Sequence, residues 1–402
     1  MQSIEETLAR ELAGIEEAGL LRQLRRIDAV NGCRLLHNGQ WLTQFASNDY
    51  LGLAAHPDIV EAGREATARF GAGSGASRLV CGSLAPHHEL DASIAQWKST
   101  AAALSFSSGF ATALGVIPAL LDKGDIIILD KLVHACCVDA ARLSGATLRV
   151  CRHNDLNHLA DILGWTEEQP DPAGRAKRVL VVTESVFSMD GDLAPLRELV
   201  ELKERHGAWL MLDEAHATGV FGPKYCGLAE SLGLANRIEI QMGTLGKGLG
   251  SAGGFIAGSR ALVDFLINSA RSFVFSTAPT PAAAAAATAA IHLLKSPVGE
   301  VLNRRLWRNI GELGRIAGGL PGGPTAAASP IVPWIIGAEG AAVGAATVLR
   351  SNGIFAPAIR YPTVPRGKAR LRFSVSARHE PVDFLALESA LKQLSAAPIP
   401  QP

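Results

Sequence analysis

Residues 209–216 read WLMLDEAH, and this stretch decides how the rest of the chain is interpreted. Its first four residues are apolar and fit one short buried strand, which acidic and histidine residues follow at once. Similar apolar runs recur between helix-like segments, a pattern typical of a parallel sheet with helical crossovers. The expected strands are Ala103–Phe106, Ile126–Leu129, Val179–Val182, Trp209–Leu212, Ile238–Met242 and Gly254–Ala257.

Polar clusters follow three of these runs directly. They are Thr183–Asp190, Asp213–His216 and Gly243–Lys247. In open α/β sheets, ligands bind beyond the carboxyl ends of the strands. We therefore expect the three clusters to meet in one crevice.

The two ends of the chain carry different patterns. Alanine-rich Pro281–Leu294 favours a helix, and Gly318–Pro330 is rich in the glycine and proline of a connection. Further strands are expected at Ile331–Ile336 and Arg370–Val375, and further helices at Ala341–Ser351 and Val382–Leu394. In Met1–Leu21, four apolar residues share one helical face and predict a packing arm: Ile4, Leu8, Leu12 and Ile15. We predict an N-terminal segment over 1–50, a large domain over 51–285 and a small C-terminal domain over 286–402.

Composition narrows the class of function. The 402 residues include 38 basic and 38 acidic side chains, so no net charge favours nucleic acid or an anionic membrane. The apolar stretch Pro281–Leu294 is shorter than the ~20 residues that a membrane span needs. The six cysteines have no CxxC spacing, and the N-terminus does not resemble a secretory leader, so we expect reduced thiols and a cytoplasmic location.

Lys247 is the first candidate for chemistry, because Gly246, Gly248 and Gly250 around it let a large group approach the backbone. A free lysine with a pKa of ~10.4 is a poor nucleophile at neutral pH, whereas an imine with an aldehyde cofactor avoids that problem. The alternative is a solvated loop lysine.

A phosphate-binding loop is a competing interpretation, since glycines precede Gly246-Lys247. It fails because the required glycine five positions before Gly246 is Gln241, and because Gly248 replaces the required Ser or Thr. The letters DEAH at Asp213–His216 therefore do not indicate a helicase motor.

Asp213 directly follows an apolar strand, so its carboxylate is expected to be partly buried and to need a cation such as a protonated pyridine nitrogen. The alternative is that Asp213 caps the next turn. Four histidines are interpreted as ordinary surface or core residues: His87, His88, His153 and His158. No metal site is predicted.

Five motifs in order resemble the α-oxoamine synthases, which are fold-type I pyridoxal-phosphate enzymes. They are Ser47–Leu53 (SNDYLGL), Gly73–Arg78 (GSGASR), Thr183–Asp192 (TESVFSMDGD), Asp213–His216 (DEAH) and Thr244–Gly248 (TLGKG). The resemblance runs from about Arg22 to about Glu380. It implies an α/β fold with a mainly parallel seven-stranded sheet, helices on both faces of the large domain, a smaller α+β C-terminal domain and an N-terminal helical arm.

The resemblance also implies a site. Lys247 would bind pyridoxal 5'-phosphate as an imine, Asp213 would pair with its ring nitrogen and His216 would bond its ring hydroxyl. His134 would stack on one ring face and Ala215 on the other. The remaining cofactor contacts implied are Gly109, Phe110, Ser188 and Thr244, and the implied substrate contacts are Arg22, Asn48, His134, Thr363 and Arg372, the last for the amino-acid carboxylate.

The reaction implied is a decarboxylative condensation of an amino acid with an acyl thioester, in which Lys247, His134 and Asp213 are catalytic. Tyr361–Pro365 resembles the members that use L-alanine and a pimeloyl thioester, on coenzyme A or on acyl carrier protein, in biotin synthesis. Members that use glycine or serine with other thioesters are the first alternative, an aminotransferase is the second, and a scaffold subunit without cofactor is the third. A homodimer is expected, with Ser276 and Thr277 reaching the partner's phosphate.

Overall fold

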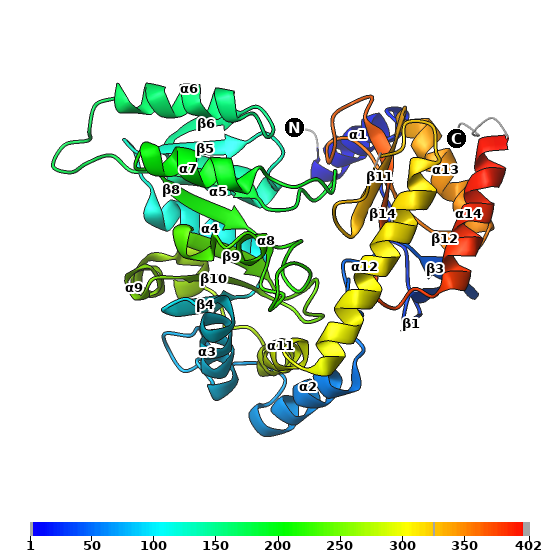
Figure 1. Ribbon diagram of the computed structural model, residues 1–402, viewed down its shortest axis with the longest axis horizontal. Helices are drawn as coiled ribbons and strands as arrows, with labels where there is room; N and C mark the ends of the chain where they lie inside the picture. The colour runs from blue at the N-terminus through cyan, green and yellow to red at the C-terminus, as the bar shows by residue number, and fades with distance from the viewer. Residues whose placement is uncertain (1–2, 325, 397–402) are drawn as a thin grey trace. The chain divides into compact units, whose positions relative to one another are not determined.

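The computed structural model describes residues 3–324 and 326–396, which fold into two compact units (Figure 1). The large unit consists of residues 48–188 and 192–304. The small unit consists of residues 3–47, 189–191, 305–324 and 326–396. The domain limits at 50/51 and 285/286 stay a prediction.

One seven-stranded sheet organises the large unit, in the order β4-β10-β9-β8-β7-β5-β6. Five neighbouring strands, from β9 to β6, are parallel, whereas β10 is antiparallel to both β9 and β4. The strands are β4 (Ala102–Phe106), β5 (Ile126–Asp130), β6 (Thr147–Cys151), β7 (Val179–Glu184), β8 (Trp209–Asp213), β9 (Ile240–Thr244) and β10 (Gly254–Gly258). The expected mainly parallel α/β sheet is confirmed.

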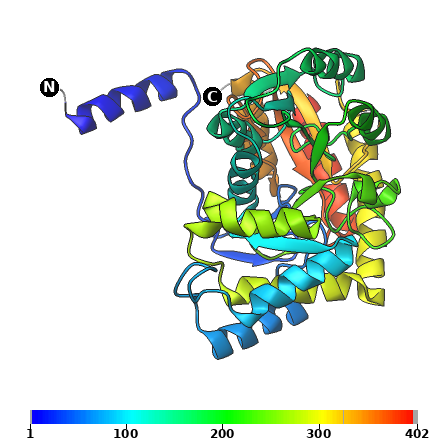
Figure 2. The same ribbon diagram turned by 90° about the vertical axis from the view of Figure 1, so that its left-hand side faces the viewer.

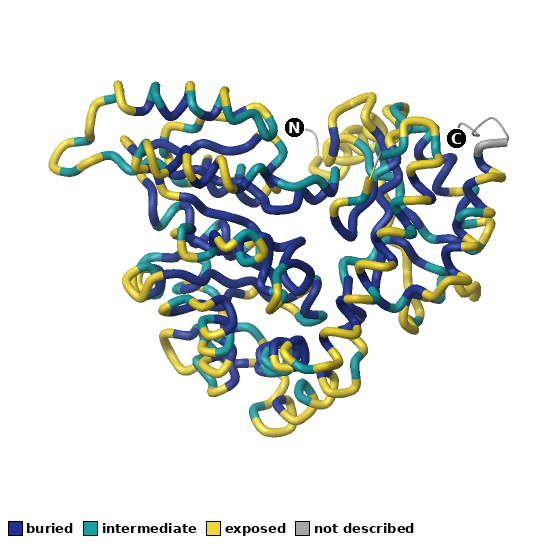
Figure 3. The backbone as a smooth tube through the Cα atoms, in the orientation of Figure 1, coloured by how far each residue is buried: buried dark blue, intermediate teal, exposed yellow. Residues whose placement is uncertain are grey.

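Both faces of this sheet are covered, so its inner strands are apolar on both sides. Figure 3 shows these strands as buried and the outer sides of the helices as exposed. The large unit's helices are α2 (Pro57–Phe70), α3 (Ala85–Lys98), α4 (Gly109–Leu120), α5 (Ala135–Ser144), α6 (Leu156–Glu167), α7 (Leu196–Arg205), α8 (Leu228–Ser231), the 3₁₀ helix η1 (Ala235–Arg237), α9 (Arg260–Ser269), α10 (Arg271–Val274) and α11 (Pro281–Leu294). On one face of the sheet, Ile127 and Val182 lie in a core with α4, α5, α9 and α10. On the other face, Ile128 and Val181 lie beside α7 and Leu159 of α6.

The alanine-rich stretch forms α11 with the limits that the sequence predicts. Thr280 caps it by accepting a hydrogen bond from the N–H of Ala283, and Pro281 stands at its first position. Its small side chains allow close packing against α2 and α3.

The small unit contains two sheets. One has the order β1-β2-β3-β12 and the other the order β11-β14-β13. Residues 189–191 belong to this unit, because Arg370 in β14 donates hydrogen bonds to Asp190 Oδ1 (2.6 Å) and Met189 O (3.2 Å). The strands are β1 (Ala29–Asn31), β2 (Arg34–His37), β3 (Gln40–Gln44), β11 (Ile331–Gly337), β12 (Ile354–Phe355), β13 (Ala358–Ile359) and β14 (Ala369–Ser374), and the helices are α1 (Ile4–Glu17), α12 (Pro297–Gly318, which begins in the large unit), α13 (Glu339–Ser351) and α14 (Pro381–Ala396).

Helix α1 has a complete N-terminal capping box, in which Ser3 and Glu6 bond each other's backbone. It has no buried residue, and Figure 2 shows it as a separate helix at the end of an extended segment. Its four apolar side chains are exposed. Within the described residues, no helix is long and apolar enough to cross a membrane. The six cysteines are free thiols.

Candidate active site

The site is built at the carboxyl edge of the large unit's sheet, where the expected polar clusters meet. Ser185 N–H donates to Asp213 O at 2.9 Å, and Glu214 N–H donates to Met242 O at 2.9 Å, so the turns after β7, β8 and β9 are bonded to one another. His134 follows β5 at the same edge, and Gly109 follows β4.

Lys247 lies in a line of polar side chains at this edge. Its Nζ is 2.8 Å from His216 Nε2, and His216 Nδ1 is 2.6 Å from the hydroxyl of Tyr50. The Tyr50 hydroxyl is also 3.2 Å from Asn48 Oδ1. Tyr50 and His216 are buried, so both ring nitrogens of His216 are engaged away from bulk water.

The loop that carries Lys247 is cross-bonded at its base. It connects β9 to β10, and Leu245 N–H donates to Gly253 O at 2.9 Å. The Thr244 hydroxyl donates to the same carbonyl at 3.0 Å, and Gly250 N–H donates to Lys247 O at 2.9 Å. Gly250 has φ +63°, and a Cβ there would lie 2.4 Å from Ala54 N, so this turn requires glycine.

Two buried carboxyl groups lie near Lys247. Asp213 Oδ1 accepts the Ala215 N–H at 2.8 Å; burial raises the pKa of Asp213, and the charge of Lys247 opposes that shift. Burial, together with the charge of Asp213, raises the pKa of Glu184 to about 8. Glu184 Oε2 accepts the Ser188 N–H at 3.1 Å, whereas its Oε1 is buried with no hydrogen-bond partner.

His134 is the N-cap of α5. Its Nδ1 accepts the Cys136 N–H at 3.2 Å and lies 3.0 Å from Cys136 Sγ. The contact with Cys136 raises the pKa of His134 although burial opposes it, and the charges of Glu184 and Asp213 add to the rise. His134 is therefore within electrostatic range of both carboxyl groups.

The N-terminus of α4 offers an anion site beside Thr244. Ser108 caps the helix by accepting the Ala111 N–H, and a Cβ on Gly109 would lie 3.9 Å from Thr244 Oγ1. A Cβ on Gly254 would lie 2.7 Å from Gly109 N, so the backbones touch here. Phe110 follows Gly109 and is exposed. The first N–H groups of a helix attract phosphate.

Three predicted substrate residues belong to the small unit. Arg22 donates to Tyr361 O at 3.2 Å and to Thr363 Oγ1 at 3.4 Å, so the segment after α1 lies against the Tyr361–Pro365 turn. Arg372 in β14 is buried and donates to Ser374 Oγ at 2.8 Å. Its neighbour Arg370 is also buried, so neither is an ordinary exposed arginine.

The sequence interpretation assigned no role to Tyr50, Glu184 or Glu214, although each lies in a quoted motif. Tyr50 contacts His216, which is 166 positions away. Glu214 forms an ion pair with Lys98 of α3 at 2.6 Å, with both side chains 1% exposed. An acid or lysine inside an apolar segment is a signal for such buried pairs.

The family model described as aminotransferase class I and II matches residues 42–390. The 8-amino-7-oxononanoate synthase of Anaeromyxobacter dehalogenans is 45% identical over 392 residues, which cover 96% of this chain and 95% of that protein.

Two solved structures are similar in fold. Serine palmitoyltransferase from S. paucimobilis, with a bound aldimine of pyridoxal phosphate and myriocin, has a TM-score of 0.90 and 28% identity, covering 98% of this chain and 100% of that one. The 8-amino-7-oxononanoate synthase of Francisella tularensis has a TM-score of 0.72 and 28% identity, covering 88% of this chain and 98% of that one.

Proposed function

We infer that the chain, which belongs to the aminotransferase class I and II family and within it to the 8-amino-7-oxononanoate synthases, condenses L-alanine with a pimeloyl thioester. The chain is an acyl-transferring, pyridoxal-phosphate-dependent enzyme of biotin biosynthesis. The observation that carries the chemistry is Lys247 Nζ, 2.8 Å from His216 and within electrostatic range of buried Asp213.

The residues at the edge of the sheet fit pyridoxal phosphate. Lys247 offers an amine, Asp213 a buried carboxylate for a protonated ring nitrogen, and the first turn of α4 a site for the phosphate beside Thr244. The Oε1 of Glu184 is a further buried polar atom, and it has no hydrogen-bond partner in the protein. When bound, the cofactor withdraws electrons from the α-carbon of the amino acid.

Each protein group has a distinct task in this proposal. Lys247 would hold the cofactor through Nζ and, when free, would take the α-proton of L-alanine; the Tyr50–His216 pair would fix the position of that amine. Asp213 keeps the ring nitrogen protonated, because burial makes a lone carboxylate costly and a cation beside it favourable. His134 would pack against the cofactor ring and would donate a hydrogen bond to the thioester carbonyl. His216, Ala215 and Ser188 make the remaining contacts with the cofactor.

Four residues are proposed to contact the substrates. We assign the amino-acid carboxylate to Arg372, whose planar guanidinium fits a carboxylate with two parallel hydrogen bonds. Arg22 and Thr363, which are hydrogen-bonded to each other, are assigned to the acyl donor. Asn48, whose Oδ1 lies 3.2 Å from the Tyr50 hydroxyl, is also assigned to substrate binding. The acyl carrier is coenzyme A or acyl carrier protein.

Release of thiol tests this proposal. Purified enzyme is mixed with a grid of amino acids and acyl thioesters, and free thiol and carbon dioxide are measured. We expect the highest kcat/KM for L-alanine with a pimeloyl thioester, with glycine weaker by about 10–200-fold for the lost methyl. Lys247→Ala is the matched inactive control.

The same grid contains the competing reactions. Serine with a palmitoyl thioester is included because the S. paucimobilis serine palmitoyltransferase shares the fold with a TM-score of 0.90. Glycine with an acetyl thioester represents the other synthases, and amino-group transfer to a keto acid without thiol release represents an aminotransferase. Faster turnover in any of these arms contradicts the assigned substrates.

We also propose a homodimer. Supporting it, α1 exposes Ile4, Leu8, Leu12 and Ile15 on one face, which an isolated chain would leave in water. In the large unit, Phe275 is 73% exposed next to Ser276 and Thr277, the residues proposed to reach the partner's phosphate.

Sedimentation velocity combined with activity tests the dimer. Inactive Lys247→Ala chains mixed with inactive Thr277→Val chains should regain part of the activity if Thr277 serves the partner's site. A fully active monomer contradicts the proposal. We further propose a cytoplasmic location, which the six free thiols support.

A further inference from the structure

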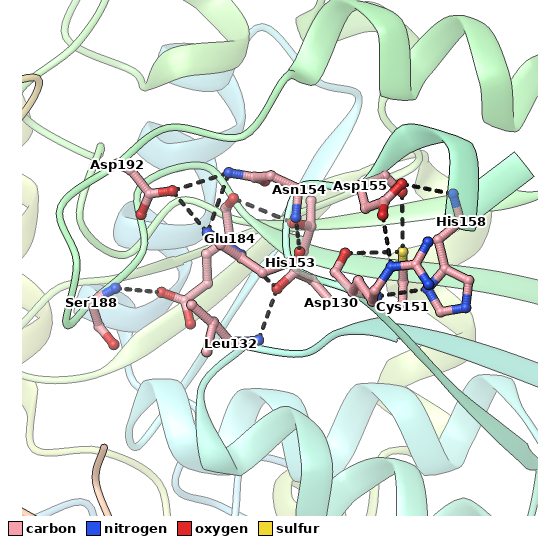
Figure 4. Close-up of polar contacts among 12 residues, drawn as sticks. Asp130, Leu132, Cys151, His153, Asn154, Asp155, His158, Glu184, Ser188 and Asp192 are labelled. Atoms are coloured by element: carbon pink, nitrogen blue, oxygen red, sulfur yellow. Dashed lines mark hydrogen bonds and ion pairs between the residues drawn. The ribbon is translucent and has the colours of Figure 1, made fainter. Parts of the chain in front are cut away.

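His153, in the turn after β6, lies between two carboxylates (Figure 4). Its Nδ1 is 3.0 Å from Asp130 Oδ1, and its Nε2 is 2.8 Å from Asp192 Oδ2. An ionised carboxylate only accepts hydrogen bonds, so both ring nitrogens must donate. A neutral imidazole has one N–H, so a ring bonded to two ionised carboxylates is an imidazolium.

Charge and burial agree with this protonation state. Burial lowers the pKa of His153, but the hydrogen bonds and charges of Asp130 and Asp192 outweigh it and raise the pKa to about 10. The ring also stands edge-on to Phe187, with 4.4 Å between ring centroids and an interplanar angle of 88°. The imidazole is thus fixed in orientation as well as in charge.

Asn154 reinforces the same two contacts. Its backbone N–H donates to Asp130 Oδ2 at 2.8 Å, and its side-chain amide donates to Asp192 Oδ2 at 3.0 Å and to Leu193 O at 3.1 Å. The residue has φ +51°, a conformation that asparagine tolerates better than most side chains. Two consecutive residues therefore connect the same pair of aspartates.

Asp130 shapes the turn that leads to His134. Its Oδ1 accepts the Leu132 N–H at 2.8 Å, and its carbonyl accepts the Val133 N–H at 3.2 Å. These two bonds fold residues 131–133 tightly at the end of β5. The position of the His134 backbone therefore depends on Asp130.

Asp192 holds the turn that carries Ser188. Its carbonyl accepts the Phe187 N–H at 3.0 Å, and Val186 pairs with Leu193. Ser188, next to Phe187, in turn donates its N–H to Glu184 Oε2 at 3.1 Å. Asp192 is thus connected through the backbone to Ser188 and to the buried Glu184.

We propose that His153 is a positioning residue, which joins the turn carrying His134 to the turn carrying Ser188 and so sets both residues against pyridoxal phosphate. This role rests on the proposed function of His134 and Ser188. His153 does not touch the reacting atoms, and it acts through Asp130 and Asp192. The sequence alone does not single out His153, because it lies outside the five motifs and has no metal-ligand spacing.

The protonation state is tested first, on the wild-type holoenzyme. Histidine labelled with ¹⁵N is followed by NMR between pH 7 and 9, and His153 is assigned by its absence in His153→Gln. Two protonated ring nitrogens across this range are expected. A neutral ring at pH 7 overturns the proposal, whatever the enzyme's substrates are.

The positioning role is tested by exchange of the α-proton of L-alanine in heavy water at saturating cofactor. His153→Gln replaces the cation by a neutral amide, whose single nitrogen can take the place of only one of the two ring nitrogens. We expect about tenfold slower exchange and about tenfold weaker binding of the cofactor, with the KM for L-alanine unchanged within about twofold. The matched control is His158→Gln, since His158 Nδ1 accepts the Arg152 N–H at 2.9 Å on the same segment but contacts neither aspartate.

A double variant separates positioning from general damage. In His153→Gln/Asp192→Asn, the two new amides can hydrogen-bond each other, so the turns are joined again without the imidazolium, and at least half of the lost exchange rate should return. An effect of His153→Gln no larger than that of His158→Gln, or a double variant slower than the single one, overturns the proposal. Absence of thiol release by the wild type would instead refute the proposed function and leave the NMR result to stand.

Discussion

Removing the amine of Lys98 should destabilise the large unit strongly. Lys98 Nζ donates to Glu214 Oε2 at 2.6 Å and to Cys226 O at 2.7 Å, and Glu214 Oε1 accepts the Ala229 N–H at 3.0 Å. Lys98→Met keeps most of the side-chain volume but leaves the Glu214 charge buried. Loss of one partner of a buried ion pair costs about 3–5 kcal/mol, and we expect a loss in that range.

A second substitution should recover most of this loss. In Lys98→Met/Glu214→Gln no charge remains, and the amide can still accept from Ala229 N–H, so the free energy of unfolding should return to within about 1–2 kcal/mol of the parent. Urea unfolding of the cofactor-free proteins, at one fixed protein concentration, measures the free energy of unfolding of both variants without a contribution from cofactor binding. A single variant that loses less than about 1 kcal/mol, or a double variant as unstable as the single one, refutes the reasoning.

Three further outcomes are expected. Lys247→Ala should fold normally and abolish turnover, and borohydride should no longer attach the cofactor to the chain; attachment to another lysine would contradict the assignment. Asp213→Asn should retain some cofactor but slow α-proton exchange of L-alanine, and exchange at the parent rate would remove the role of Asp213. Because the pKa of Glu184 is raised to about 8, the folded state of cofactor-free protein binds more protons than the unfolded state above pH ~4.5, so stability should fall as pH rises from there to about 8, by up to about 5 kcal/mol at ~1.4 kcal/mol per pH unit. Glu184→Gln should flatten that slope, whereas the exposed control Glu65→Gln should leave it unchanged.

The large unit was predictable where strands are buried on both faces. Trp209–Asp213 and Ile126–Asp130 are continuous apolar runs that end in a polar residue, and such runs are recognised without knowledge of their neighbours. Strand β6 was not predicted, because Thr147–Cys151 lies at the sheet edge and exposes Arg149 and Val150. An edge strand carries a weaker apolar pattern.

The site was predictable residue by residue only where a motif carries the chemistry. Lys247 and Asp213 stand out by their local setting; the structure places Lys247 Nζ 2.8 Å from His216 Nε2, and the roles of these residues stay a prediction. His153 was interpreted as an ordinary histidine, because its partners lie 23 and 39 positions away. Local patterns contain no information on such pairings, which depend on how strands β5, β6 and β7 are ordered in the sheet.

The loop between β9 and β10 has a kinetic consequence. Because β10 runs back antiparallel to β9, the chain leaves the sheet at Thr244 and re-enters it at Gly254, and the bond from Leu245 N–H to Gly253 O closes the loop. In the proposed function, L-alanine would displace the amine of Lys247 from the cofactor, and an amine on such a short closed loop could not diffuse away. Its effective molarity at the substrate's α-carbon would far exceed the concentration of any free amine, since well-oriented groups within one molecule reach roughly 10⁵–10⁸ M. The antiparallel direction of β10 would thereby keep the amine of Lys247 available as the proposed base.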